Sequence, residues 1–189
     1  VHLGYLTYDF DTCTVHIPNQ EVQKEFINCI EDGGWEPVMD AIRESEELLA
    51  ATIRGEEETV ARMIENAHQE NTSILAYNDE NSLACVIALA YYSAKKNYVV
   101  YRELAGGKGF ADMVFVPRKT TQTPAIVVEL KWNQTAEAAI TQIKRKQYVE
   151  SLKDYRGEVI LVGINYESKE LKKDDYKKHS CKIERITMA

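Results

Sequence analysis

The stretch AIVVELKW, residues 125–132, places two charged residues at the end of an otherwise apolar segment. Its first four residues are apolar and rich in β-branched side chains, which is typical of a strand covered on both faces. Side chains two positions apart in a strand share a face, so Glu129 and Lys131 lie on one face and Leu130 on the other. Burying a carboxylate and an ammonium costs free energy unless each has a partner. The chain must therefore fold so that this strand end meets other polar groups.

The length and composition are those of a globular domain. The chain has 189 residues, of which 44% are hydrophobic and 28% charged, enough for one domain with a hydrophobic core. No apolar run approaches the roughly 18–20 residues that span a bilayer, and no signal peptide opens the chain. The four cysteines are too scattered for a disulfide framework or a zinc site, so we expect a reducing compartment, the cytoplasm. Because the first residue is Val1 rather than methionine, we expect a longer parent protein.

The net charge of −7 conceals a segregation of charge along the chain. Residues 1–80 carry a net charge of −14, residues 81–130 carry +3 and residues 131–189 carry +4. The acidic and basic parts are therefore expected to do different jobs. The acidic total argues against nonspecific nucleic-acid binding by the whole chain, although it leaves room for a local basic groove.

Hydrophobic periodicity and turn residues predict a hairpin, three helices and then an α/β region. The hairpin covers residues 3–17, and Asn19 is the expected N-cap of the first helix. Acidic amphipathic helices follow at 36–54 and 56–70. The second half should contain a helix at 79–94, strands at 98–104, 109–116 and 124–132, a helix at 135–152, a strand at 159–164 and an edge strand at 181–188. The helix at 135–152 would be a crossover that makes the next strand parallel to 124–132.

This layout brings a further acid to the same place. If strands 109–117 and 124–132 pair as a hairpin, Asp112 falls towards the same end of the sheet as Glu129 and Lys131. Two carboxylates with the carbonyl oxygen of Leu130 make a hard-oxygen site for Mg²⁺, with Mn²⁺ as an alternative ion. Such a site with one lysine suits phosphodiester hydrolysis. The alternative interpretation is a structural ion pair between Glu129 and Lys131 at a sheet end.

The order of these residues resembles that of the PD-(D/E)XK nuclease superfamily. The resemblance rests on GFAD at 109–112, on ELK at 129–131 after an apolar strand, and on the order helix, three strands, helix, strand. More closely, the chain is similar to the nuclease-like domain at the C-terminus of certain bacterial AAA-ATPase-like proteins. The supporting segments are YLT at 5–7, IPNQEV at 17–22, GKGFAD at 107–112, AAITQIKRKQY at 138–148 and ILVGINY at 160–166.

The resemblance implies a role for each matching residue. Asp112 and Glu129 would be the metal-binding acids, and Lys131 the catalytic lysine. Glu80 matches an upstream acid that completes the metal shell or supports a second ion. Gln142 matches a glutamine on the helix after the E-x-K strand. From the residues alone, Glu80 can equally be a first-turn acid favoured by the helix dipole, and Gln142 a solvated helix residue.

The chain also departs from the superfamily pattern. Asp112 follows Ala111 instead of the proline that gives the superfamily its name. Tyr148 lies six residues after Gln142, whereas the related exonucleases have a tyrosine four residues after it, a position held here by Lys146. The basic run at 144–146 either provides surface charge or contacts a nucleic-acid backbone.

We therefore predict an α/β fold with a restriction-endonuclease-like core, in which helices flank a mixed central sheet. The expected domains are residues 1–71, the hairpin and acidic helices, and residues 72–189, the nuclease-like domain. The predicted function is Mg²⁺-dependent hydrolysis of phosphodiester bonds in DNA, with an attached AAA-type ATPase, a homodimer if both strands are cut, and no membrane. The alternative is a non-catalytic interaction module on such an ATPase. The acidic first eighty residues favour the module, whereas Asp112, Glu129 and Lys131 together favour the enzyme.

Overall fold

A computed structural model gives the structure of the chain in eight segments. They are residues 7–9, 14–17, 19–32, 36–71, 80–118, 123–152, 155–167 and 179–188. The chain forms two compact units, residues 1–41 and residues 42–189, and each is described by itself. The predicted domain division between residues 71 and 72 stays a prediction.

The first unit contains the predicted hairpin and first helix. Strands β1 (Thr7–Asp9) and β2 (Thr14–His16) pair antiparallel. Helix α1 (Gln20–Asp32) follows, and the side-chain Oδ1 of Asn19 accepts a hydrogen bond from the backbone N–H of Val22 at 2.9 Å. This contact satisfies one of the free N–H groups of the first turn, so the predicted N-cap is confirmed.

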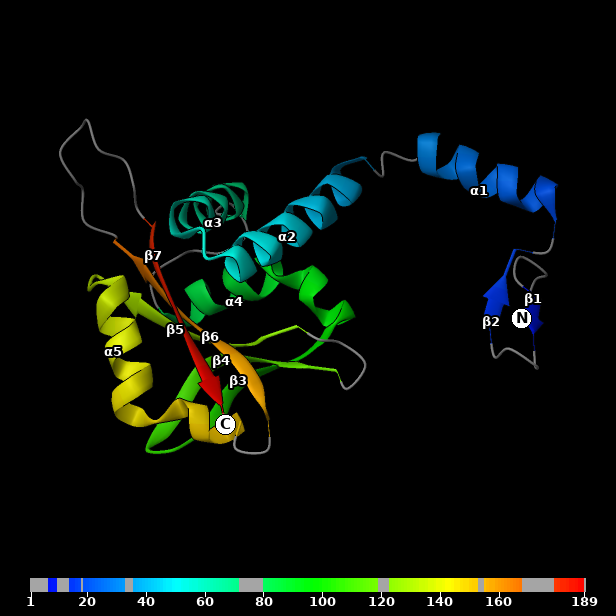
Figure 1. Ribbon diagram of the computed structural model, residues 1–189. Coiled ribbons are helices and arrows are strands. Elements are labelled where there is room, and N and C mark those ends of the chain that lie inside the picture. The colour runs from blue at the N-terminus through cyan, green and yellow to red at the C-terminus, as the bar shows by residue number, and fades with distance from the viewer. Residues whose placement is uncertain are drawn as a thin grey trace. The chain divides into compact units, whose positions relative to one another are not determined.

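The second unit is built around a five-stranded sheet. The strands lie in the order β3-β4-β5-β6-β7, and only β5 and β6 run parallel (Figure 1). Helix α5 and a following 3₁₀ turn connect the two parallel strands, as a crossover must. The α/β fold with a mixed sheet flanked by helices is thereby confirmed. The strands are β3 (Tyr98–Gly106), β4 (Gly109–Pro117), β5 (Ala125–Trp132), β6 (Gly157–Tyr166) and β7 (His179–Met188).

Two predicted helices end earlier than expected and continue as 3₁₀ turns. Helix α4 (Glu80–Ala90) is followed by a turn at Tyr92–Lys96, and α5 (Ala136–Lys146) by a turn at Tyr148–Leu152. The break after α5 occurs at Gln147, whose φ of 57° is left-handed and ends the helix. The predicted N-terminus of α5 is confirmed by Thr135, whose side chain accepts the N–H of Ala138 at 3.0 Å.

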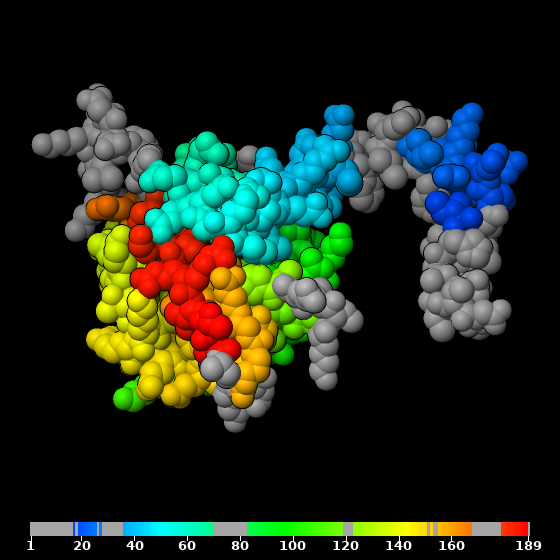
Figure 2. Space-filling model, viewed as in Figure 1, coloured from blue at the N-terminus to red at the C-terminus, as the bar shows by residue number. Residues whose placement is uncertain are grey.

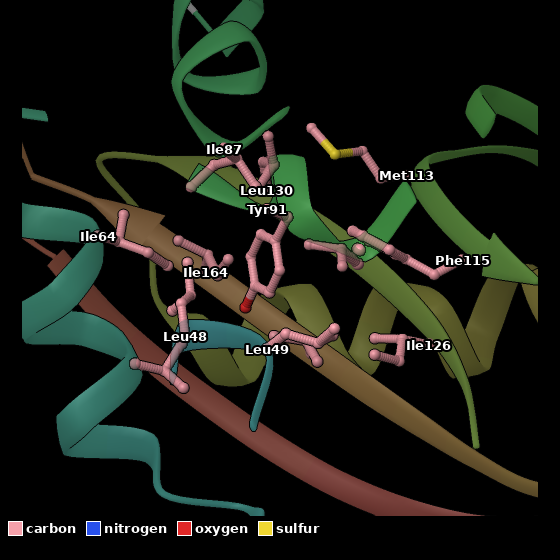
Figure 3. Packing of buried hydrophobic residues seen from close by; sticks show 14 of the residues in the cluster. Leu48, Leu49, Ile64, Ile87, Tyr91, Met113, Phe115, Ile126, Leu130 and Ile164 are labelled. Carbon is pink, nitrogen blue, oxygen red and sulfur yellow. The ribbon is translucent and has the colours of Figure 1, made fainter. Parts of the chain in front are cut away.

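The sheet separates two hydrophobic clusters, one on each face. One face is covered by three helices: the part of α2 (Glu36–Arg54) that begins at Ile42, α3 (Glu57–Asn71) and α4. Helix α5 covers the other face (Figure 1). The apolar residues of β5 serve both faces by alternation, as a doubly covered strand requires. Figure 3 shows the first cluster, which includes Leu48, Leu49, Ile64, Ile87, Tyr91, Met113, Phe115, Ile126, Leu130 and Ile164.

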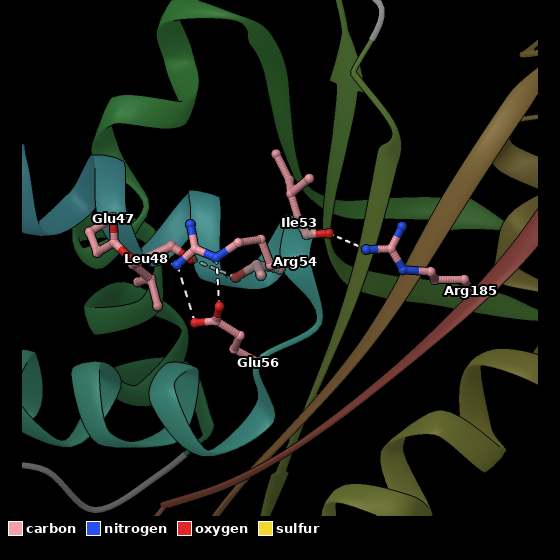
Figure 4. A network of polar contacts seen from close by, with 7 residues as sticks. Glu47, Leu48, Ile53, Arg54, Glu56 and Arg185 are labelled. Carbon is pink, nitrogen blue, oxygen red and sulfur yellow. Dashed lines mark hydrogen bonds and ion pairs between the residues drawn. The ribbon is translucent and has the colours of Figure 1, made fainter.

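Arginine side chains fix the end of α2 against the sheet. Arg54 contacts both Glu47 and Glu56, each at 2.6 Å, which closes the turn between α2 and α3 (Figure 4). Arg185 on β7 donates to the backbone carbonyl of Ile53, one of the carbonyls that the helix itself leaves unpaired. No helix among the described residues has the length and apolarity needed to cross a membrane.

Two buried histidines join α3 to β7. The Nδ1 of His68 lies 3.1 Å from the Nε2 of His179, and the Nδ1 of His179 lies 2.6 Å from a carboxylate oxygen of Glu65. Burial raises the pKa of Glu65, but the hydrogen bond with His179, together with smaller contributions from Gln69 and His68, outweighs it. The pKa of Glu65 therefore lies below its ordinary value of 4.5. An acid whose pKa is lower in the folded state than in the unfolded state stabilises the fold at pH values above the unfolded-state pKa. This stabilisation is lost as the pH falls through the folded-state pKa.

Replacing Glu65 by glutamine is expected to lower the free energy of unfolding at pH 7 by about 1.5–3 kcal/mol, the usual contribution of a hydrogen bond to a charged group. The difference from the wild type should shrink as the pH falls below 4.5, because the carboxyl of Glu65 is then protonated in the unfolded chain and, at its lower folded pKa, also in the folded one. Urea denaturation at pH 7 and pH 4 measures the difference in unfolding free energy between the variant and the wild type. Glu44→Gln, which changes an exposed glutamate of α2 in the same way, is the matched control. A loss that is equally large at both pH values would contradict the prediction.

Candidate functional site

The charged end of β5 is buried and internally paired. Glu129 is 2% exposed and Lys131 6% exposed. The Nζ of Lys131 donates to Oε1 of Glu129 at 2.8 Å and to the backbone carbonyl of Leu130 at 2.9 Å. Both side chains lie on the face that α5 covers, because the alternate residues Ala125 and Val127 pack in the cluster on that face. The contact that the alternative interpretation describes, an ion pair between Glu129 and Lys131, is therefore present, and its charges are held close to a backbone oxygen.

Asp112 reaches this pair because β4 and β5 separate there. Their ladder contains three residue pairs and ends where Met113 lies opposite Val128. In a continued ladder Asp112 would lie opposite Glu129, but no backbone pairing occurs there. Instead, the carboxylate of Asp112 accepts a hydrogen bond from the backbone N–H of Leu130 at 2.6 Å. A side-chain oxygen thus replaces a strand carbonyl, and the strands open at the position where the charged groups meet.

A distortion in β3 lies directly opposite Asp112. The β3–β4 ladder omits the pair that Glu103 and Asp112 would make, and Glu103 has a left-handed φ of 52°. Consequently Ala111 and Val114, although three residues apart, both pack on the α5 side of the sheet. A non-glycine residue in this conformation is uncommon and costs free energy, and such residues cluster at functional sites. The sequence carries no signal for it, since glutamate has no preference for a left-handed backbone.

The electrostatics of Asp112 follow from its crowded position. Burial raises the pKa of its carboxyl above the ordinary value, and the charge of Glu103 adds to this effect. The N–H of Leu130, the charge of Lys131 and a hydrogen bond with Glu129 act in the opposite direction without cancelling it. Two carboxyl groups therefore face each other beside one ammonium, so the site favours additional positive charge.

Helix α5 contributes an amide to the same site. The Nε2 of Gln142 donates to Oε1 of Glu129 and to the hydroxyl of Tyr148, the latter at 3.1 Å. Gln142 is therefore not a solvated helix residue. Tyr148 is buried, and burial raises the pKa of its hydroxyl above the ordinary value. Sequence spacing gave Tyr148 no role, because the left-handed Gln147 ends the helix and returns the chain towards the site.

The close packing of α5 against the sheet depends on Gly163 in β6. A Cβ at this position would collide with the carbonyl oxygen of Ala136 and lie 2.9 Å from the Cβ of Ala139. Gly163 also lies opposite Glu129 in the parallel β5–β6 pairing. The helix that carries Gln142 can therefore approach the charged strand end only because a glycine faces it.

Replacing Gly163 by alanine is expected to lower the free energy of unfolding by about 1–3 kcal/mol, the usual cost of overpacking a core. The added methyl must push α5 away from β6, because its three nearest atoms all belong to α5, and the carbonyl oxygen of Ala136 and the Cβ of Ala139 cannot rotate away. For a chain of 150–250 residues each kcal/mol lowers Tm by roughly 2–4 °C. Gly55→Ala is the control, since nothing lies within 4 Å of a Cβ there and only its left-handed φ of 82° is strained. A smaller loss at Gly163 than at Gly55 would contradict this account of the packing.

Comparison with protein families decides the class of the chain. The family model described as the PD-(D/E)XK nuclease superfamily matches residues 78–176, more than half of the chain. The chain belongs to the PD-(D/E)XK nuclease superfamily. A search of curated proteins gave no significant match. The matched region contains β3 to β6 and α5, and so contains the whole arrangement around Asp112, Glu129, Lys131 and Gln142.

The structure brings together four of the five residues that the PD-(D/E)XK resemblance singles out. Asp112, Glu129, Lys131 and Gln142 are linked by the hydrogen bonds given above. Glu80 is the first residue of α4, and its side chain lies outside the described atoms. The catalytic and metal-binding roles of all five residues stay predictions.

The oxygen atoms at this strand end fit a hard divalent cation in their chemistry. The carboxylates of Asp112 and Glu129 and the carbonyl of Leu130 are ligand types that Mg²⁺ and Mn²⁺ prefer. Within the part of the chain that the structure describes, no group of three or more His, Cys, Asp or Glu side chains is placed to hold a metal. Water or Glu80 would have to complete the shell, as is usual for Mg²⁺, which keeps several waters.

Proposed function

We propose that this domain is a metal-dependent nuclease that hydrolyses phosphodiester bonds in DNA. The observation that carries the proposal is the departure of Asp112 from the β4–β5 ladder to meet Glu129 and Lys131 at a buried strand end. A purely structural ion pair would not require a second, half-buried carboxylate beside the same ammonium, because the additional charge increases the desolvation cost. Membership of the PD-(D/E)XK superfamily supports the same reaction class.

The proposed metal ligands are Asp112, Glu129 and the carbonyl of Leu130, with Glu80 as a third acid. Bound Mg²⁺ would act as a Lewis acid on the phosphate and lower the pKa of a bound water. Lys131 would turn its ammonium towards a phosphate oxygen or the attacking water, where it stabilises developing negative charge. Its present contacts with Glu129 and Leu130 hold it at the same strand end.

Gln142 would act as a positioning residue in this proposal. Its amide holds Oε1 of Glu129 and the hydroxyl of Tyr148 at the same time, so it fixes the carboxylate relative to α5. A carboxylate held by a neighbouring hydrogen bond keeps one orientation, which is what a metal ligand requires. Burial of the strand end also keeps bulk water from competing for these contacts.

The second candidate is a non-catalytic interaction module attached to an AAA-type ATPase. It is favoured by the net charge of −14 over residues 1–80, which would repel a nucleic acid unless those residues face away from it. For the enzyme, we propose the same attached ATPase, a cytoplasmic location, and a homodimer wherever both strands of a duplex are cut.

The test is cleavage of supercoiled plasmid, labelled linear duplex and labelled single-stranded DNA with Mg²⁺, Mn²⁺ or chelator. Wild type should cut only with the ion, and Asp112→Asn should reduce cutting by at least about 10²-fold, the scale on which catalytic electrostatic contacts act. The asparagine keeps an oxygen that can accept the N–H of Leu130, so the fold should be retained. Glu150→Gln, an exposed residue of the turn after α5, is the control.

Metal-dependent cutting that Asp112→Asn abolishes would establish the nuclease. No cutting by the wild type, together with no Mg²⁺ binding by calorimetry, would reject the enzyme for this chain and favour the interaction module.

A further inference from the structure

The helix face that reaches the charged strand end continues into two cationic side chains. Arg145 and Lys146 follow Gln142 by three and four residues, so all three share one face of α5. At a rise of about 1.5 Å per residue, Lys146 lies about 6 Å further along the helix axis. Among the described residues neither cation forms an ion pair, whereas Lys144 contacts Glu184 at 2.6 Å. The basic run therefore divides into one side chain neutralised by β7 and two that are not.

The turn between β3 and β4 adds a third cation at the same place. The backbone N–H of Lys108 donates to the carbonyl of Lys146 at 2.8 Å, which fixes the turn against the end of α5. Gly107 permits this approach, since its φ is 51° and a Cβ there would collide with the same carbonyl. Figure 1 shows the green β3–β4 turn below the end of the yellow helix, and Figure 2 shows green atoms beside yellow ones at that corner.

An exposed aromatic ring stands on the same hairpin. Phe110 is 63% exposed, the highest value among the described large apolar side chains. It lies two residues before Asp112 in β4, roughly 7 Å along the strand. Its neighbours Gly109 and Ala111 pack towards Tyr148, so by alternation the phenyl ring lies on the other side of the hairpin. Folding gains nothing from an exposed phenyl group, whereas an exposed ring at the tip of a hairpin can act as a stacking platform for a nucleic-acid base.

We propose that a single strand of DNA binds over the tip of the β3–β4 hairpin, where it meets Lys108, Arg145 and Lys146 on the side of α5 and Phe110 on the opposite side. We call these four residues the hairpin–helix rim. The three cations would contact successive phosphates, and Phe110 would stack on an unpaired base. The strand would then pass from the rim to the end of β5, where Asp112 and Glu129 lie. A duplex offers no free base face inside its stack, so the stacking contact selects single-stranded substrate. This inference rests on the proposed nuclease function and adds its substrate form.

The experiment measures binding separately from cleavage. Fluorescence anisotropy with a labelled single strand of about 15 nucleotides, and with the matching duplex, is recorded for Asp112→Asn in chelator. In that background, Lys108→Gln, Arg145→Gln and Lys146→Gln combined should weaken single-strand binding at least tenfold. The slope of log affinity against log salt should fall by about 2, because each lost phosphate contact removes about 0.7.

Phe110→Ala should act differently from the cation variants. It should weaken single-strand binding about 5- to 100-fold, the range seen when one stacking ring is removed, with the salt slope and duplex binding unchanged. Tyr92→Ala and Lys95→Gln are matched controls, because this exposed aromatic and its neighbouring cation lie on the turn after α4. Neither control should change the affinity.

Equal or tighter binding of the duplex, or no effect of the rim variants on the single strand, would overturn the inference. Each outcome is separable from failure of the proposed function. Binding that the rim variants weaken, with no cleavage by the wild type in Mg²⁺ or Mn²⁺, would reject the nuclease and leave the rim as a nucleic-acid interface. Metal-dependent cleavage with rim variants that bind as the wild type does would reject the rim and leave the nuclease.

Discussion

Replacing Lys131 by methionine should lower the free energy of unfolding by about 3–5 kcal/mol, the usual cost of removing one partner of a buried ion pair. The carboxylate of Glu129 would stay buried at 2% exposure without the ammonium that now lies 2.8 Å from it. The double variant Glu129→Gln with Lys131→Met removes both charges and should recover much of this loss, because a neutral pair of similar volume has no charge to desolvate. Urea denaturation in chelator measures all three unfolding free energies.

The exposed pair of Lys144 and Glu184 provides the control for this cycle. Lys144→Met should cost less than about 1 kcal/mol, because solvent screens a surface ion pair. A loss at Lys131 no larger than that at Lys144, or a double variant less stable than Lys131→Met, would contradict the account of the site. The large expected cost also means that loss of cleavage in a Lys131 variant is informative only when its fold has been checked.

Replacing Asp112 by asparagine should raise the Tm of the metal-free protein while it removes divalent-ion binding. Burial holds the pKa of the Asp112 carboxyl above its ordinary value, which means that its ionised form destabilises the fold. An acid whose pKa is higher in the folded state lowers the free energy of unfolding once it is ionised. This loss of stability is absent at pH values below the unfolded-state pKa and complete above the folded-state pKa. The neutral amide avoids this penalty, and its oxygen can still accept the N–H of Leu130.

Thermal denaturation at pH 7 in chelator and in Mg²⁺ tests this prediction. In chelator the variant should melt a few degrees above the wild type, given roughly 2–4 °C per kcal/mol at this chain length. Mg²⁺ should raise the Tm of the wild type, since an ion that binds only the folded state stabilises it, and should leave the variant unchanged. A variant that melts lower in chelator, or that gains as much from Mg²⁺ as the wild type, would show that Asp112 is not a strained metal ligand.

Both predictions concern a site whose geometry lowers the free energy of unfolding. The left-handed conformation of Glu103, the place of Asp112 outside the β4–β5 ladder and the desolvation of the buried Glu129–Lys131 pair each cost free energy, and all three lie around one strand end. The surrounding sheet must compensate. On the side of the site away from β4, β6 pairs along its length with both β5 and β7, and α5 packs closely against Gly163. These contacts stabilise the fold enough to hold the site.

Local sequence signals determined much of the molecule. The strand AIVVELKW, the cap at Asn19 and the order of helices and strands were predictable, because apolar alternation and capping act over a few residues. The pairing of β4 with β5 placed Asp112 near Glu129 in the prediction, and the structure agrees. The positions of Glu129 and Lys131 on one face followed from strand geometry alone.

Only the tertiary structure decided how these residues meet. The replacement of a ladder carbonyl by the carboxylate of Asp112, the left-handed Glu103 and the contact of Gln142 with Glu129 depend on how separate strands and a helix pack together. Helix propensity could not predict that α5 ends at Lys146, because the carbonyl of that residue accepts the N–H of Lys108 from the docked β3–β4 turn. The sequence therefore specified which chemical groups reach one end of the sheet, and packing against α5 and β3 specified their geometry.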